Sequence, residues 1–145
     1  AAWSCPFDPD VLLLVLDKEH TTSENIRHTK KFVVALPCEE QKKTALDLGS
    51  VHGRDVGNKL QIKDVKTEKS QKFGLDVMSG ALAYFECELQ DEKLFEEKGI
   101  CLSKVVNVYV KDDCWDDKEE CFNPGIKRTL HHVAGSTFCS GGDLV

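Results

Sequence analysis

The sequence predicts an α+β domain in which one or two N-terminal helices pack on an antiparallel sheet. Residues 11–16 form a continuous apolar run, which is typical of a buried strand. A helical pattern follows this run, and the β-branched and aromatic residues that favour strands gather after residue 50. With 145 residues the chain can bury a core of its own, so we expect a single domain over residues 1–145.

The helices are expected in the first third of the chain. Thr21 and Glu24 have the spacing of a capping box, in which two side chains satisfy free amide groups at the start of a helix. This pattern predicts a helix over about residues 23–31. Residues 32–36 are compatible with helix and with strand, and residues 39–49 predict a second short helix that a glycine ends.

The strands are expected in the remaining two thirds. Alternating polarity or β-branched and aromatic content predicts four of them, at residues 59–65, 85–89, 104–110 and 126–135. A short polar turn or helix is expected at residues 91–99. Loops are expected at residues 50–58, which hold two glycines, and at residues 114–125, which are rich in charge.

Charge and hydropathy limit the partners. The net charge is −6, from 25 acidic against 19 basic residues, which opposes binding to a phosphate backbone. The lysine-rich stretch 59–72 is the one candidate basic patch, and the acidic stretch 111–121 stands against it, so RNA is a disfavoured partner. Run 11–16 is far shorter than the roughly 20 apolar residues that cross a membrane, so no membrane contact is expected.

The seven cysteines predict a disulfide-stapled protein from an oxidising compartment. No pair has the C-x-x-C spacing of a zinc site. The adjacent His131 and His132 would point to opposite faces of a strand, so no metal and no cofactor are expected. Three disulfides and one free thiol would follow, in a secreted, extracellular protein. Spacing leaves the connectivity open, but two pairs suggest themselves: Cys114 with Cys121, and Cys5 with Cys139.

The two ends of the chain resemble those of a known family. Trp3, Ser4 and Cys5 form an aromatic-x-Cys motif, and residues 135–139, GSTFC, place a cysteine near the other end. In these motifs and in element order the chain resembles the Y/F/W-x-C secreted effectors of powdery mildews and rusts, and the fungal ribotoxins of the same superfamily. The resemblance implies a ribonuclease-like fold and a virulence protein that a fungal plant pathogen secretes and can translocate into host cells.

The catalytic members of that superfamily cleave RNA with a Glu base, a His acid and an Arg that binds the phosphate. The resemblance offers Glu86 or Glu88, Arg128, and His131 or His132 for these roles. Arg128 and His132 are only four residues apart, whereas the family separates the two by most of a hairpin. The two glutamates alternate with apolar residues, as on a solvated sheet face. No catalytic residue is therefore assigned, and a pseudo-ribonuclease is expected.

The function expected from this reasoning is a non-catalytic, monomeric effector that binds a host macromolecule, an immune receptor being one candidate. Its contact residues would be Trp115, held out by the 114–121 loop, together with His52 and Arg54 in the loop at 50–58. A secreted ribonuclease is one alternative. An extracellular ligand-binding or inhibitor protein is the other.

Overall fold

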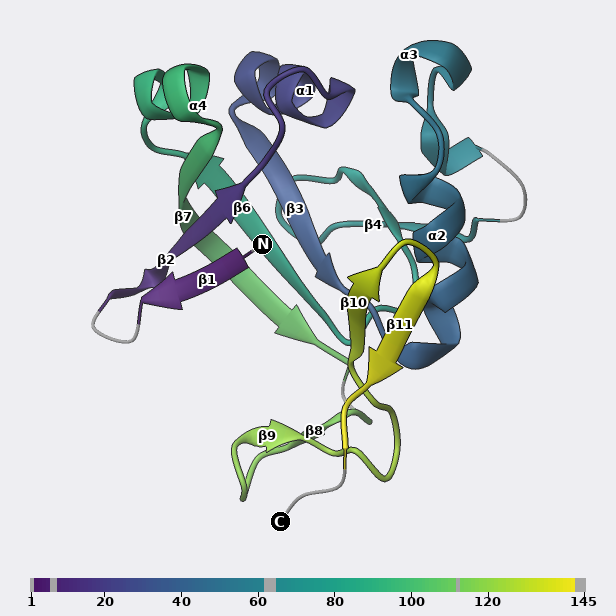
Figure 1. The fold of residues 1–145 in the computed structure, drawn as a ribbon. Coiled ribbons are helices and arrows are strands. Elements are labelled where there is room, and N and C mark those ends of the chain that lie inside the picture. Colours follow the sequence, from purple (N-terminus) through teal and green to yellow (C-terminus); the bar gives the residue numbers. More distant parts are fainter. Residues whose placement is uncertain (1, 6–7, 62–64, 112, 143–145) are drawn as a thin grey trace.

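A five-stranded antiparallel sheet forms the centre of the protein (Figure 1). The computed structural model describes the backbone of residues 2–5, 8–61, 65–111 and 113–142, and the side chains of these ranges from residue 10 onward. The strand order is β1-β2-β7-β6-β3. The strands span Ala2–Cys5 (β1), Asp8–Val15 (β2), Ile100–Val110 (β7), Ala83–Leu89 (β6) and Lys31–Leu36 (β3).

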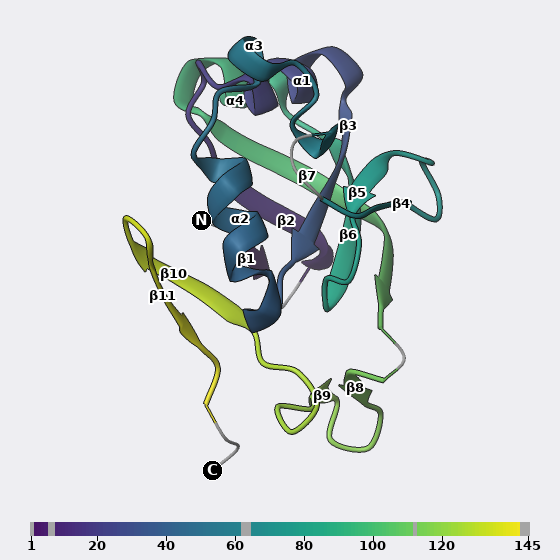
Figure 2. The ribbon, with the colours of Figure 1, turned by 90° about the vertical axis from the view of Figure 1, so that its right-hand side faces the viewer.

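Three hairpin-like pairs of short strands surround this sheet. They are Thr67–Lys69 with Asp76–Met78 (β4, β5), Trp115–Asp116 with Cys121–Phe122 (β8, β9), and Leu130–Ala134 with Thr137–Ser140 (β10, β11). The last pair stands beside α2 rather than in the central sheet (Figure 2). Backbone hydrogen bonds attach its base to the end of β3, where Glu39 N–H donates to Arg128 O and Leu130 N–H to Pro37 O.

The helices are short. They span Thr21–Thr29 (α1), Lys42–Gly49 (α2), Gly53–Val56 (α3) and Glu92–Lys98 (α4), with 3-10 turns at Glu39–Gln41 (η1) and Lys59–Gln61 (η2). Figure 1 places α1 and α4 at one end of the sheet. None of the helices within the described ranges is long and apolar enough to cross a membrane.

The main core lies between the sheet and the helices α1 and α4. Its buried members are Leu12, Leu14, Ile26, Phe32, Cys87, Phe95 and Cys101. Strand β7 has β2 on one side and β6 on the other. Apolar residues of β2 and α1 thus meet Phe95 and Cys101 of the last third of the chain because β7 pairs with β2, which no local pattern reveals.

The predicted elements were largely found where the sequence placed them. The helix expected at residues 23–31 is α1, residues 32–36 belong to a strand, and residues 39–49 form η1 and α2. The capping box was wrong, because the N-cap of α1 is His20 and its side chain makes no capping hydrogen bond. The strand expected at residues 59–65 was also wrong, since η2 forms there and residues 62–64 lie outside the described part of the chain.

The expected disulfide framework was wrong as well. All six cysteines with described side chains are free thiols: Cys38, Cys87, Cys101, Cys114, Cys121 and Cys139. The thiol of Cys114 is buried against Cys38 and Leu82 instead of bridging to Cys121. Because Cys139 is a free thiol, it forms no bridge to Cys5, whose side chain lies outside the described residues. Secretion loses this support and stays a prediction.

The solvated sheet face expected around Glu86 and Glu88 holds for Glu88, which is partly exposed, but is wrong for Glu86. The turn between β4 and β5 covers this face, and the Glu86 carboxylate is fully buried beneath it. It accepts hydrogen bonds from Lys72 N–H at 2.9 Å, Phe73 N–H at 2.8 Å and Asn107 Nδ2 at 2.7 Å. Burial alone would raise the pKa of Glu86, but the hydrogen bonds from Asn107, the turn and Ser70 lower it. Glu86 is therefore a charged anchor for the turn.

Candidate functional site

A hollow opens at the start of α1, and we call it the α1 hollow. It has a volume of about 390 Å³ and is lined by His20, Thr21, Thr22, Leu48, Gly49, Val51, His52, Gly53 and Lys59. A neighbouring depression of about 370 Å³ shares Thr21, Thr22, Gly53 and Lys59 with it. Three separate segments supply these residues, namely the turn into α1, the turn from α2 to α3, and η2.

The α1 hollow is rich in hydrogen-bond donors. The first amide groups of a helix have no partner within that helix, and His20 does not cap those of α1 with its side chain. The hydroxyl groups of Thr21 and Thr22 stand at the same helix end. Lys59 is half-buried, and its Nζ donates to Leu48 O at 3.0 Å, which holds the ammonium group at the wall. Such a set of donors suits an anion.

The shape of the α1 hollow depends on Gly53. A Cβ added to Gly53 would lie 3.0 Å from both Cβ and Cγ2 of Thr21, so the turn can approach α1 only without a side chain at this position. Arg54 also holds the α2–α3 turn against α1. Its guanidinium donates to Glu19 O at 3.0 Å and forms an ion pair with Glu24.

A second hollow lies between α2 and the β10–β11 hairpin, and we call it the hairpin hollow. It measures about 520 Å³ and is lined mainly by apolar groups, from Ala45, Leu46, Gly49, Ser50, His132, Gly135 and Phe138. The rings of His132 and Phe138 lie 5.0 Å apart, at an angle of 57°. His132 Nε2 lies 3.0 Å from Gly135 O, which fixes the imidazole within the hairpin.

Two glycines keep the hairpin hollow open. A Cβ at Gly49 or at Gly135 would meet no atom within 4 Å, so the space beside each is free for a ligand. Gly49 lines the α1 hollow as well. The two hollows therefore share Gly49 as a lining residue; the α1 hollow is polar and basic, and the hairpin hollow is apolar and aromatic.

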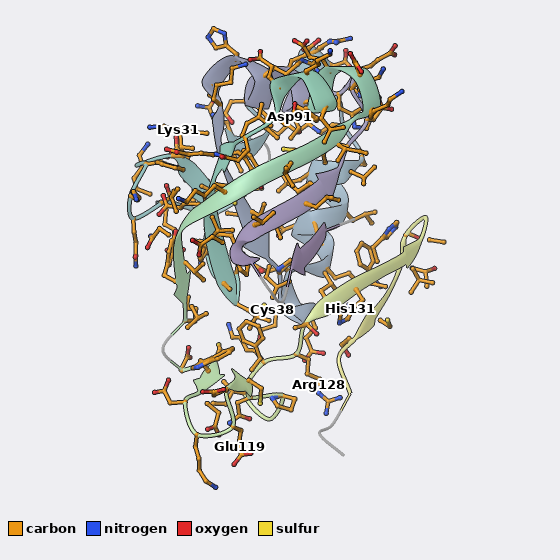
Figure 3. All side chains as sticks on the ribbon, turned by 90° about the vertical axis from the view of Figure 1, so that its left-hand side faces the viewer. Lys31, Cys38, Asp91, Glu119, Arg128 and His131 are labelled. Carbon is orange, nitrogen blue, oxygen red and sulfur yellow. The ribbon has the colours of Figure 1, made fainter. Side chains whose placement is uncertain are left out.

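The residues that the ribonuclease resemblance offered are not assembled into a site. The carboxylate of Glu86 accepts hydrogen bonds from the 70–73 turn and from Asn107. Glu88 forms an ion pair with Lys31, with 3.8 Å between Oε1 and Nζ. The histidines instead belong to the hairpin, where the Nε2 atom of His131 lies 2.8 Å from Thr129 Oγ1. Figure 3 shows Arg128 and His131 near the base of the hairpin. Glu86 and Glu88 thus have partners in the 70–73 turn, β7 and β3, whereas His131 and His132 have partners in the hairpin and just before it.

The three residues expected to contact a partner lie in two places. Trp115 is half-buried in β8, and its ring packs edge-on against Phe122 at 5.3 Å. His52 borders the α1 hollow, and Arg54 is engaged with α1 as described above. Thr21, Gly53, Lys59 and Phe138 were not selected from the sequence. The sequence did contain one usable signal, the HGRD turn at 52–55, whose glycine marks a close approach of two segments.

Residues 1–130 match the family described as flavin reductase like domain, and the chain belongs to this family. The uncharacterized protein YddH of Escherichia coli K12 is 30% identical over 149 residues, which cover 100% of this chain and 78% of YddH. An FMN-binding domain of a flavin reductases-like enzyme from Shewanella baltica has a TM-score of 0.84 at 25% identity, over 99% of this chain and 77% of that one.

More distant structures share the fold. An FMN-binding protein from Thermus thermophilus has a TM-score of 0.81 at 17% identity, over 99% of this chain and 76% of that one. Together these likenesses define a flavin reductase-like split barrel. The family match and the shared fold overturn the expected ribonuclease-like fold. The resemblance to fungal effectors is also wrong, since these relatives are bacterial. The functions derived from that resemblance, effector and ribonuclease, were therefore wrong, and a host partner is left without support.

Proposed function

We propose that the protein binds FMN across the two hollows and serves as a flavin-dependent reductase. The observation that carries this proposal is that the two hollows share Gly49 as a lining residue, because this sets a hollow suited to an anion beside an apolar, aromatic one. FMN has the same two-part character, with a phosphate at one end and a flat ring at the other. Family membership and the FMN-binding neighbour from Shewanella baltica support the same assignment.

The α1 hollow fits the phosphate. Its donors are the first amide groups of α1, the hydroxyls of Thr21 and Thr22, and the ammonium group of Lys59. Gly53 lets the α2–α3 turn pack against the helix start, and the Arg54 contacts keep the turn in place. Hydrogen bonds from several fixed donors to one anion are stronger than those between neutral groups, so this end would supply much of the affinity.

The hairpin hollow fits the flavin ring. Its volume lies within the roughly 300–1,000 Å³ of pockets that hold small molecules, and aromatic and apolar walls exclude water from a flat ring. Phe138 offers aromatic surface on the side of its ring away from Lys42 Nζ, which lies 5.9 Å from the ring centroid, and His132 brings a polar edge whose orientation Gly135 fixes. A bound flavin would supply hydride and one-electron transfer. The chain itself would hold the ring, shield it and position its phosphate.

A third hollow gives an alternative place for the ring. It measures about 450 Å³ and lies along α1, β3 and β5, lined by residues that include Thr22, Asn25, Leu60, Leu75, Val77 and Met78. Leu60 and Thr22 also line the depression at α1. We favour the hairpin hollow because Phe138 and His132 provide aromatic surface there, whereas Phe32, the one aromatic residue of the third hollow, is buried in the core.

Titration of the purified protein with FMN tests the proposal. We expect micromolar or tighter binding, seen as quenching of flavin fluorescence, and faster oxidation of NADH or NADPH when FMN is present. Riboflavin, which lacks the phosphate, should bind at least about tenfold more weakly because it loses charge-assisted hydrogen bonds. The proposal would be overturned if neither flavin bound, or if both bound equally well.

A further inference from the structure

Two imidazoles border the mouth of the α1 hollow. His20 ends the loop before α1, and His52 ends the turn before α3, so each is an N-cap residue with extended backbone. Both are exposed and both line the hollow. Their ring centroids lie 6.0 Å apart, with 65° between the ring planes. The two rings thus add nitrogen donors to the amide, hydroxyl and ammonium groups at the helix end where we place the phosphate.

The charged groups around His20 and His52 determine whether protonation of the two imidazoles is favourable in the empty hollow. On the acidic side, Asp17 Oδ2 lies 3.7 Å from His20 Nε2, and Glu24 is engaged by Arg54. The other charged groups of these segments are Lys18, Glu19, Asp55 and Lys59, and Lys18 Nζ donates to Glu97 O at 3.3 Å. Two imidazolium ions 6.0 Å apart beside the Lys59 ammonium would repel one another when the hollow is empty. A phosphate dianion would remove this repulsion and would favour the protonated rings.

We infer that His20 and His52 bind the FMN phosphate as imidazolium ions, so that FMN binding takes up protons. This inference rests on the proposed function and adds a specificity device to the same site. Histidine is the side chain whose charge changes between about pH 5 and 8, so the preference for FMN over riboflavin should rise as the pH falls through this range. Each proton taken up can strengthen binding by up to tenfold per pH unit.

Calorimetry at about pH 6.5 tests the inference directly. FMN is titrated in two buffers with different ionisation enthalpies, which gives the number of protons taken up per FMN bound. The phosphate itself has a second pKa near 6, so it can release a fraction of a proton on binding. The comparison of variants with the unmodified protein removes this contribution, because the phosphate is the same in both.

The variants are His20→Asn, His52→Asn and the double variant. His28→Asn is the matched control, because His28 is an exposed histidine of α1 outside the residues that line the α1 hollow. We expect the double variant to take up about 0.5–1 fewer protons per FMN and to lose the pH dependence of the preference for FMN. The control should behave as the unmodified protein does. Riboflavin should bind with the same proton balance in all variants.

An equal proton count in the double variant and the unmodified protein would overturn the inference, and FMN binding by both would show that the proposed function survives. Failure of the unmodified protein to bind FMN at any pH would overturn both. Circular dichroism and thermal unfolding of each variant verify that it is folded. Both histidines are exposed, so we expect their replacement to change stability by less than about 0.5 kcal/mol.

Discussion

Gly53 lies so close to Thr21 that a Cβ on Gly53 would stand 3.0 Å from the Cβ atom of Thr21. Atoms this close must move, and Thr21 is the first residue of α1. The contact therefore couples the α2–α3 turn to the helix end that we propose for the phosphate. It also explains why these two segments, distant in sequence, can form one wall.

Replacement of Gly53 by alanine should damage both stability and FMN binding. We expect a loss of about 1–3 kcal/mol in unfolding free energy, because the new methyl group overpacks against Thr21. The affinity for FMN should fall by about tenfold or more as the turn moves away from α1. Urea unfolding and flavin titration measure the two effects.

Gly49→Ala is the matched control for the stability effect alone, since Gly49 lines both hollows. A Cβ at Gly49 meets no atom within 4 Å, and Gly49 is the last residue of α2. Alanine should leave stability unchanged or raise it by up to about 1 kcal/mol. Equal destabilisation by the two alanines would contradict the role that we give to the Gly53–Thr21 contact.

Substitution of Lys59 should weaken the binding of the FMN phosphate, and substitution of Phe138 should weaken the binding of the flavin ring. Lys59→Ala should weaken FMN binding by about tenfold and riboflavin binding hardly at all, since it removes a charge beside the phosphate. Phe138→Ala should weaken both flavins, because both have the ring. Fluorescence titration with each flavin measures these ratios.

Leu75→Ala distinguishes the third hollow from the hairpin hollow. Leu75 lines the third hollow and is exposed. If this substitution weakened riboflavin binding more than Phe138→Ala did, the flavin ring would lie in the third hollow and our placement would be wrong.

Glu86→Gln should destabilise the protein by about 2–4 kcal/mol at neutral pH. The amide would turn an NH2 group towards donors such as the backbone N–H groups of Lys72 and Phe73, which now share a carboxylate. Glu88→Gln on the same strand is the control, and since Glu88 is in a partly exposed ion pair we expect less than about 1 kcal/mol. Chemical unfolding of both variants measures the difference.

Acid should destabilise the protein partly through protonation of the Glu86 carboxylate. The pKa of Glu86 is lowered on folding, so its contribution is present above the unfolded value of 4.5 and is lost as the pH falls through the lower, folded value. Unfolding curves between pH 7 and pH 3 should therefore show a smaller acid loss in Glu86→Gln than in the unmodified protein. An identical loss in the two would argue against a charged Glu86.

The thiols give a further test. Burial raises the pKa of Cys87 and of Cys101 to about 11, against an ordinary value of 9.0. Cys139, which is exposed, should react with thiol reagents first, and the two core thiols only on unfolding. Thiol counting in denaturant without reductant should find at least six groups; one group alone would restore the disulfide framework.

Alkali should destabilise the protein through these buried thiols. A pKa raised on folding gives stability that is present below pH 9 and is lost as the pH rises towards 11, at about 1.4 kcal/mol per pH unit for each thiol. Cys87→Ala and Cys101→Ala should each reduce the slope of stability against pH in this interval. An unchanged slope in both would mean that other groups cause the loss.

Local sequence patterns were enough to predict much of the secondary structure. The β-branched run at 104–110 lies within β7, the segment 91–99 forms α4, and the helices near the N-terminus formed close to the expected residues. These signals succeed because helix and strand periodicity are set by neighbouring residues. The paired cysteines failed as a signal, since composition alone does not distinguish a buried thiol from half of a disulfide.

The fold and the site were decided by contacts between segments that are distant in sequence. The strand around Glu86 reads as half-solvated, yet a turn from another part of the chain covers it and supplies the hydrogen bonds that keep the carboxylate charged. Thr21, Gly53 and Lys59 converge only because β2, α1 and the α2–α3 turn take fixed places around the sheet. The sequence by itself determined most of the longer helices and strands, but not η2, α3 or the β8–β9 pair. The packing of distant segments determined which face is buried, which thiols stay free and where a ligand can bind.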